Sequence, residues 1–308
     1  MRTLSLAFLA LGTVACSGDA VHLEYQSTLW NETSGVVMHD DTARGHGSML
    51  ETTCEFDMSS GAVTGDVDLP TAGEVVSDVV DGAVLAHTSA GLHIIRGLEW
   101  DPNEDIALGG VVDAAFSGDG PVALVQGDSS CSVVWTDSDL SVDVGACGPN
   151  AELLADPSNG VAFLADGGLV SRVDVDGLTE LAAGDAVAFN PTTGMLFVAS
   201  GDKLAQLDAT GAELWSTGLS DTIYDMTDLG ARGGVAVVTS DRSLQIIGED
   251  GGVRSTNALP ASAKVVSNNS GRDLSLVLPD QVNFFRVEDG PKRMSVVTNT
   301  PVENPFSD

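Results

Sequence analysis

The chain has 308 residues, 43% of them hydrophobic, and a formal net charge of −32. The apolar content is enough for a sizeable core, which excludes a chain that is disordered by composition. With 45 acidic residues against 13 basic ones, the surface repels phosphate backbones and anionic lipid head groups, so we expect no nucleic-acid partner and no electrostatic attachment to membranes. The plainest explanation of the charge is solubility in a salty medium, where screening weakens the self-repulsion.

The N-terminal residues have the organisation of an export signal. Met1 to Thr3 is a short basic start, and Leu4 to Val14 is an apolar run that is too short to span a bilayer. Small residues and Cys16 follow this run. The pattern predicts a secretory signal peptide, and ordinary secretion with cleavage after Ala20 is one way to read it.

The segment Thr13-Val14-Ala15-Cys16 also resembles the signal of bacterial lipoproteins, in which small residues precede a cysteine that becomes lipid-modified. The resemblance implies a signal peptide over residues 1–15, lipidation of Cys16 and a tether over residues 16–21. Ser17, rather than Asp, follows the cysteine, which in that class implies sorting to the outer membrane. A lipid anchor would then be the chain's only attachment to the membrane.

A unit of four short apolar runs repeats along the rest of the chain. It is clearest over residues 185–220, where Gly, Asn, Asp or Pro bounds each run and none is long enough for a helix. Four antiparallel strands joined by tight turns, about the size of one β-propeller blade, are therefore predicted. The turn between the first and second runs ends at Gly35, Gly82, Gly120, Gly160, Gly194, Gly234 and Gly271. The turn between the third and fourth runs falls at Gly61, Gly97, Asp139, Gly177, Gly211, Gly251 and Gly290.

Two interleaved series of seven markers predict an all-β protein, a seven-bladed β-propeller of four-stranded antiparallel blades over residues 22–297. A loose C-terminal tail, residues 298–308, would follow. Residues 21–31 could close the ring by pairing with the last blade, or Met294 to Val297 could be that blade's own fourth strand. An irregular β-sandwich or solenoid of similar hairpins is the alternative fold.

Cys131 and Cys147 are predicted to form a disulfide. They open the third and end the fourth predicted strand of one repeat. Antiparallel partners have a constant sum of residue numbers, so a hairpin centred on Asp139 would place the two cysteines opposite each other. Cys54 would stay unpaired, and three reduced, buried cysteines are the alternative.

Residues 204–215, LAQLDATGAELW, resemble the repeat of quinoprotein-like (PQQ-type, WD40-like) propellers, which runs Ala-Leu-Asp, Thr-Gly and then Trp in the fourth strand. Trp215 has no counterpart in other repeats, where Leu181, Ser255 and Met294 stand in its place. The resemblance implies the propeller fold more than any activity. Quinone-dependent members carry an adjacent Cys-Cys pair, which this sequence lacks.

An acidic rim is the candidate binding site. An Asp follows the predicted second strand in five consecutive repeats, at Asp128, Asp166, Asp202, Asp241 and Asp280. Equivalent positions recur around the centre of a propeller, so we expect these residues on one rim together with His39 and His87, which end the second strands of the first two repeats. The rim could attract a cationic partner or divalent ions, or its aspartates could simply form turns.

A metal site at His39 and His87, with Asp40, Asp41 and His46 nearby, is a weaker hypothesis because the spacing matches no metal motif. No Gly-x-Ser-x-Gly, P-loop or Rossmann fingerprint is present. We therefore identify no catalytic residue, no cofactor and no metal ligand.

The function that follows is a non-enzymatic envelope lipoprotein, monomeric, whose propeller is a scaffold for an unidentified protein or ligand. One alternative is a propeller enzyme, a hydrolase or oxidoreductase, with its site in the central funnel. The other is a structural subunit of an outer-membrane assembly complex.

Overall fold

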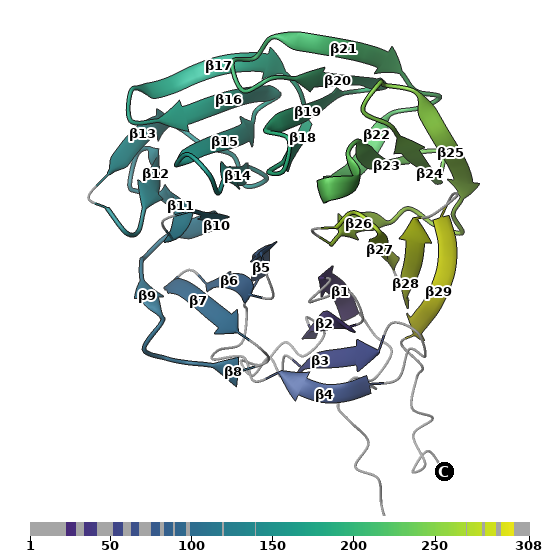
Figure 1. Ribbon diagram of the computed structural model, residues 1–308. Coiled ribbons are helices and arrows are strands. Elements are labelled where there is room, and N and C mark those ends of the chain that lie inside the picture. Colours follow the sequence, from purple (N-terminus) through teal and green to yellow (C-terminus); the bar gives the residue numbers. More distant parts are fainter. Residues whose placement is uncertain are drawn as a thin grey trace, which may run out of the picture.

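The computed structural model describes residues 23–28, 34–41, 52–57, 63–67, 75–80, 83–88, 90–96, 99–118, 120–138, 140–268, 270–278, 281–287 and 291–298. The predicted signal peptide, Cys16, the tether and the tail beyond residue 298 lie outside these ranges. The strands are antiparallel and their sheets stand in a ring (Figure 1). Among the described residues, no helix is both long and apolar enough to cross a membrane.

Across the described ranges the strands form six four-stranded sheets and one five-stranded sheet, each made of consecutive strands. The first strand of each sheet lies nearest the centre of the ring (Figure 1), and we name each sheet by this inner strand. The inner strands are β1 (Leu23–Thr28), β5 (Val75–Val80), β10 (Val111–Ser117), β14 (Glu152–Asp156), β18 (Ala186–Asn190), β22 (Ile223–Asp228) and β26 (Lys264–Ser267). The second strands are β2 (Ser34–Asp41), β6 (Ala83–Thr88), β11 (Gly120–Gln126), β15 (Val161–Asp166), β19 (Met195–Ser200), β23 (Val235–Thr239) and β27 (Asp273–Leu278).

The third strands are β3 (Thr52–Asp57), β7 (Gly91–Arg96), β12 (Cys131–Trp135), β16 (Leu169–Asp174), β20 (Lys203–Leu207), β24 (Ser243–Ile247) and β28 (Gln281–Val287). The fourth strands are β4 (Val63–Val67), β8 (Glu99–Trp100), β13 (Ser141–Gly145), β17 (Gly177–Ala183), β21 (Glu213–Gly218), β25 (Val253–Ala258) and β29 (Pro291–Thr298). Two further elements are the short strand β9 (Ile106–Ala107) and the 3₁₀-helix η1 (Gly230–Arg232).

The prediction of an all-β propeller with four-stranded antiparallel blades is confirmed. The prediction that all seven sheets have this form is wrong. In the described part of the chain six sheets have four strands, and the β5 sheet departs from the pattern. There β8 and β9 pair with opposite ends of β7, so the fourth position is split in two. The interruption is a turn at Asp101, whose Oδ1 accepts the amide of Asn103 at 2.9 Å, and the intervening Pro102 cannot donate to a ladder.

The burial of the strands explains why the repeat can be recognised from the pattern of apolar residues in the sequence. Every residue of β23 and β27 is buried, because a second strand is covered on both faces by neighbouring sheets. The fourth strand β13, at the outer edge, instead alternates between exposed and half-buried residues. Continuous apolar runs and alternating runs therefore follow each other along the chain, as the fourth strands β21 and β25 also show.

The core is a series of apolar contacts between neighbouring sheets. One cluster joins the β10 and β14 sheets through residues such as Leu124 and Leu153, and another joins the β22 and β26 sheets through Leu244 and Leu276. These side chains are 0–2% exposed. Because each sheet buries both faces against its neighbours, stability depends on the ring being complete.

The ring closes between the first and last sheets without exchange of a strand. β1 pairs with β2, and β29 supplies the fourth strand of the last sheet. β1 packs beside β26 on one side and β5 on the other. Of the two closures considered from the sequence, the structure has the one with a native fourth strand.

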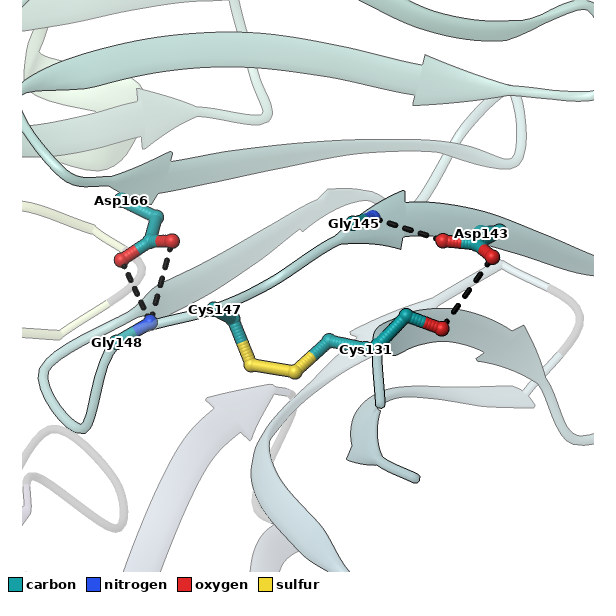
Figure 2. The surroundings of a disulfide bond; sticks show 7 residues. Cys131, Asp143, Gly145, Cys147, Gly148 and Asp166 are labelled. Atoms are coloured by element: carbon teal, nitrogen blue, oxygen red, sulfur yellow. Dashed lines mark hydrogen bonds between the residues drawn. A yellow bond between two sulfur atoms is a disulfide. The ribbon is translucent and has the colours of Figure 1, made fainter. Parts of the chain in front are cut away.

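The structure contains the disulfide between Cys131 and Cys147, with a Cα–Cα distance of 5.8 Å (Figure 2). The predicted register is wrong, since Cys131 pairs with Gly145 and Cys147 lies beyond the end of β13. The hairpin centres between residues 137 and 138, since Val134 pairs with Ser141, and not on Asp139 as predicted. In the loop-entropy model, closing a loop of this length stabilises the fold by about 3 kcal/mol. For Cys54, the structure describes only the backbone, in β3.

Candidate functional site

The turns between second and third strands form one face of the ring, and the acidic rim lies there. Asp128, Asp166, Asp202 and Asp241 end the second strand or follow it in four successive sheets, while Asp280 lies outside the described residues. The connection between sheets runs along the same face, since Ile223 N donates to Gly201 O at 2.8 Å. Neighbouring strands run in opposite directions, so a first strand starts at the same end of its sheet as the second strand ends. The inner strands therefore also begin on this face.

Two of the rim aspartates, Asp166 and Asp241, accept hydrogen bonds from other residues of the protein. Asp241 accepts hydrogen bonds from Thr239 Oγ1 at 2.6 Å and Ser243 Oγ at 2.9 Å. These hydroxyls, Thr239 first, hold the pKa of its carboxyl below the ordinary value. Asp166 accepts the amide of Gly148 at 3.1 and 3.2 Å, which ties the segment after Cys147 to the next sheet (Figure 2). Asp128 and Asp202 are exposed.

The two histidines proposed for the rim lie at the ends of β2 and β6. His39 pairs through its backbone with Tyr25 and Thr52. His87 is 8% exposed and its Nδ1 lies 2.5 Å from Ser77 Oγ of β5. Burial lowers the pKa of His87, so its ring is neutral at neutral pH and adds no positive charge to this face.

Four acidic residues of the inner strands, Asp78, Asp113, Glu152 and Asp225, form a second feature that the sequence analysis missed. We call them the inner carboxylates. Each of the three aspartates lies one residue past a β-bulge. The three bulges come directly after Val76, Val111 and Ile223. A pattern of an apolar residue, any residue and Asp, at the start of a repeat, is the signal that could have revealed them.

The three aspartates bridge neighbouring sheets. Asp78 accepts a hydrogen bond from the amide of Phe116 at 2.7 Å. Asp113 accepts one from the amide of Leu153 at 2.7 Å. Asp225 accepts one from the amide of Val265 at 2.6 Å. In each pair the donor belongs to the inner strand of the following sheet, 38 to 40 residues on. These amides lie on the unpaired edge of an inner strand, so the carboxylates satisfy donors that no ladder can reach.

Burial raises the pKa of two of these aspartates, Asp113 and Asp225. For Asp113 the pKa rises to about 7, because of burial first and then the charge of Asp78, against the lowering effect of its amide donors. For Asp225 burial raises the pKa to about 6, opposed by the Val265 amide and by Lys264.

Glu152, the first residue of β14, carries the largest of these shifts, to about 8. Its side chain is exposed to water, yet protein atoms enclose it on the remaining sides, and this enclosure is the main cause. The charges of Asp113 and Asp225 raise the pKa further, and Lys264 counteracts them. Charges from sheets across the ring therefore act on one another, and this face holds protons near neutral pH.

Within the described ranges, no group of three His, Cys, Asp or Glu side chains is placed to hold a metal ion. Of the candidate metal residues, His46 lies outside those ranges, and for His39, Asp40 and Asp41 only the backbone is described. The acidic residues of this face can bind positive charge and exchange protons.

No protein-family model matches the chain, and no curated protein matches its sequence. Its fold is similar to Hsv2 of Kluyveromyces marxianus, with a TM-score of 0.62 and 14% identity over 91% of this chain and 100% of that one. Kluyveromyces lactis Hsv2 gives 0.61 and 12% identity, with the same coverage. The WD40 β-propeller domain of Doa1 gives 0.62 and 15% identity over 86% of this chain and 94% of that one. These similarities confirm a WD40-like propeller, whereas the lipoprotein and quinoprotein-type resemblances remain predictions.

We expect the stability of the fold to fall between pH 5 and pH 8, because folded Asp113 binds its proton more tightly than unfolded Asp113 does. The folded pKa of about 7 against 3.8 means that deprotonation above pH 4 favours the unfolded chain. At ~1.4 kcal/mol per pKa unit, Asp113 should account for a loss of about 2–3 kcal/mol over this range. Asp113→Asn, which keeps an acceptor for Leu153, should remove that part of the loss in urea unfolding at both pH values.

The matched control is Asp176→Asn, which removes one charge from an exposed turn and should leave the pH dependence unchanged. An Asp113→Asn curve parallel to that of the unsubstituted protein would contradict this account.

Proposed function

We propose that the protein is a non-enzymatic binding scaffold for a positively charged protein partner, which docks on the face formed by the acidic rim and the inner carboxylates. The observation that carries this proposal is the position of Asp113, Glu152 and Asp225 at the starts of inner strands, on the face where the rim lies. Charges of one sign gathered around a concave mouth focus the electric field and attract opposite charge. A basic segment would meet the rim first and the inner carboxylates next.

Binding of such a partner is coupled to protons. The pKa values of about 7 for Asp113 and about 8 for Glu152 leave part of this face protonated near neutral pH. A positive charge close by favours the ionised carboxylates, so binding releases protons. Linkage then requires the affinity to rise as the pH rises from 5 to 8.

The β5 sheet belongs to this scaffold as a seventh blade, since β8 and β9 together fill the position of one fourth strand. We place the scaffold in the cell envelope, exported by residues 1–15 and held at the outer membrane by acyl chains on Cys16. A structural role in an outer-membrane assembly complex is one form that such partner binding could take. The charge of −32 argues against nucleic acid as the partner.

A hydrolase is the second candidate, because Ser77 Oγ lies 2.5 Å from His87 Nδ1. A neutral histidine next to a serine can act as the general base that activates the serine as a nucleophile. Asp113, however, accepts from the amides of Ala114 and Leu153, and among the described residues no hydrogen bond joins a carboxylate to His87 to orient the base as in a triad. Covalent capture of Ser77 by a fluorophosphonate would favour this candidate over the scaffold.

A decalysine peptide tests the scaffold proposal. We expect saturable binding by calorimetry at low salt, with an affinity that is higher at pH 8 than at pH 5. The variant Asp128→Asn/Glu152→Gln/Asp202→Asn should weaken binding about fivefold or more, since exposed charge pairs contribute about 0.2–1 kcal/mol each.

The control variant Asp176→Asn/Glu180→Gln/Glu249→Gln removes the same number of charges from exposed positions away from this face. It should retain most of the affinity. Equal weakening by both variants would mean that the peptide binds the acidic surface in general, and the proposed face would be rejected.

Anchoring is tested by Cys16→Ala in a double-membraned bacterial host. Because acyl chains would be the main membrane attachment, this variant should move from the membrane fraction to the soluble envelope fraction. Ser17→Ala, which keeps the cysteine, should remain with the membranes. If Cys16→Ala stays in the membrane fraction, the lipoprotein assignment is wrong.

A further inference from the structure

On the face opposite the acidic rim, fourth-strand side chains cover the hairpin turn of the following sheet. Trp215 of β21 lies against Gly251, where a Cβ would come within 2.9 Å of the indole ring. Its Nε1 donates to the carbonyl of Glu249 at 2.7 Å. Leu181 of β17 lies in the same way against Gly211, where a Cβ would be 3.0 Å from Leu181 Cδ2. At these two junctions an apolar side chain fills the space between sheets.

Ser255 occupies the equivalent position one sheet further on. Trp215 pairs with Gln206 in its hairpin and Ser255 pairs with Ile246, 40 residues later in both strands. A serine side chain is too small to fill the space that an indole fills. Its Oγ is buried and has no hydrogen-bond partner among the described residues, which is unfavourable for a hydroxyl.

A cavity of about 550 Å³ lies beside Ser255. Its floor includes Leu229, Ile246 and Val287, which are 1–4% exposed. Val287 of β28 corresponds to Ile247, which packs with Trp215 in one apolar cluster at the preceding junction. The cavity therefore occupies the place that the indole of Trp215 takes one junction earlier, and its size lies within the roughly 300–1,000 Å³ of small-molecule sites.

Two arginines, Arg232 and Arg254, line this cavity. Arg254 Nη2 is held by Asp250 Oδ1 at 2.7 Å, and Arg232 Nη1 donates to the carbonyl of Val287. Both side chains are thus positioned by the protein itself. A guanidinium beside an apolar floor favours an aromatic ring, through contact with the ring face.

We propose that this cavity binds a planar aromatic ring with an N–H donor, of the indole type. The apolar floor takes the ring, Ser255 Oγ accepts from the N–H, and the two arginines contact the ring face. The site is separate from the acidic rim, so it does not depend on the function proposed above. The ring could be a free small molecule or the side chain of a partner's tryptophan.

Titration calorimetry with indole and 1-methylindole tests the proposal. The unsubstituted protein should bind indole saturably and about three- to tenfold more tightly than 1-methylindole, which lacks the donor. Ser255→Ala keeps the cavity but loses the acceptor, so it should bind the two compounds equally. Absence of saturable indole binding, or an unchanged preference in Ser255→Ala, would overturn the proposal.

Filling the cavity from within is the second test. Ser255→Trp should abolish indole binding and raise the melting temperature, as expected if the new indole packs as Trp215 does. Thr256→Trp places the same residue at the next, exposed position of β25 and should leave indole binding unchanged. Full binding by Ser255→Trp would overturn the proposal, and the Ser255→Ala comparison decides if that variant does not fold.

The source of the ring is settled with N-acetyl-tryptophanamide. Competition with indole at similar affinity means that the site accepts a tryptophan side chain from a protein partner. Binding of indole without such competition means that the cavity accepts only the free ring. Both results support an aromatic site, and binding of neither compound would reject it.

Discussion

Each inner strand of this ring has one edge in a ladder and one edge without a strand partner, and that constraint shapes the rest of the structure. At three junctions an aspartate past a β-bulge, Asp78, Asp113 or Asp225, accepts an amide from the next sheet. The bulge turns the carboxylate toward the neighbour. These bonds hold the sheets together, but they also place acidic groups in protein surroundings, which raises the pKa of Asp113 and Asp225.

The fold was predictable because its repeat is local. Turn glycines such as Gly194 and Gly211 adopt positive φ, 70° and 86°, and only glycine does so without strain, so both marker series follow from backbone geometry. The exact pairing of residues between strands was harder to predict from the sequence. The hairpin between Cys131 and Cys147 centres between residues 137 and 138 instead of on Asp139, which leaves Cys147 beyond the ladder, and a turn at Asp101 split one fourth strand. Single-residue shifts of this kind depend on tertiary contacts that periodicity does not record.

The candidate site was predictable only in part. The rim followed from counting turns, yet bonds such as those of Asp241 to Thr239 and Ser243 show that turn formation accounts for some of it. The three inner aspartates, Asp78, Asp113 and Asp225, were hidden among 45 acidic residues, because what distinguishes them is a partner 38 to 40 residues away in the following sheet. Likewise, comparison of the repeats shows that Ser255 occupies the position of Trp215, but only the structure reveals the cavity beside it.

Amide hydrogen exchange, resolved by NMR, tests most directly whether aspartates join the sheets. The amides of Phe116, Leu153 and Val265 lie outside the ladders but donate to carboxylates. They should exchange as slowly as ladder amides of the buried strand β23, such as that of Val237, because both would open only when the ring unfolds. Exchange at the rate of exposed turn amides would mean that these bonds do not persist in solution and would contradict the account.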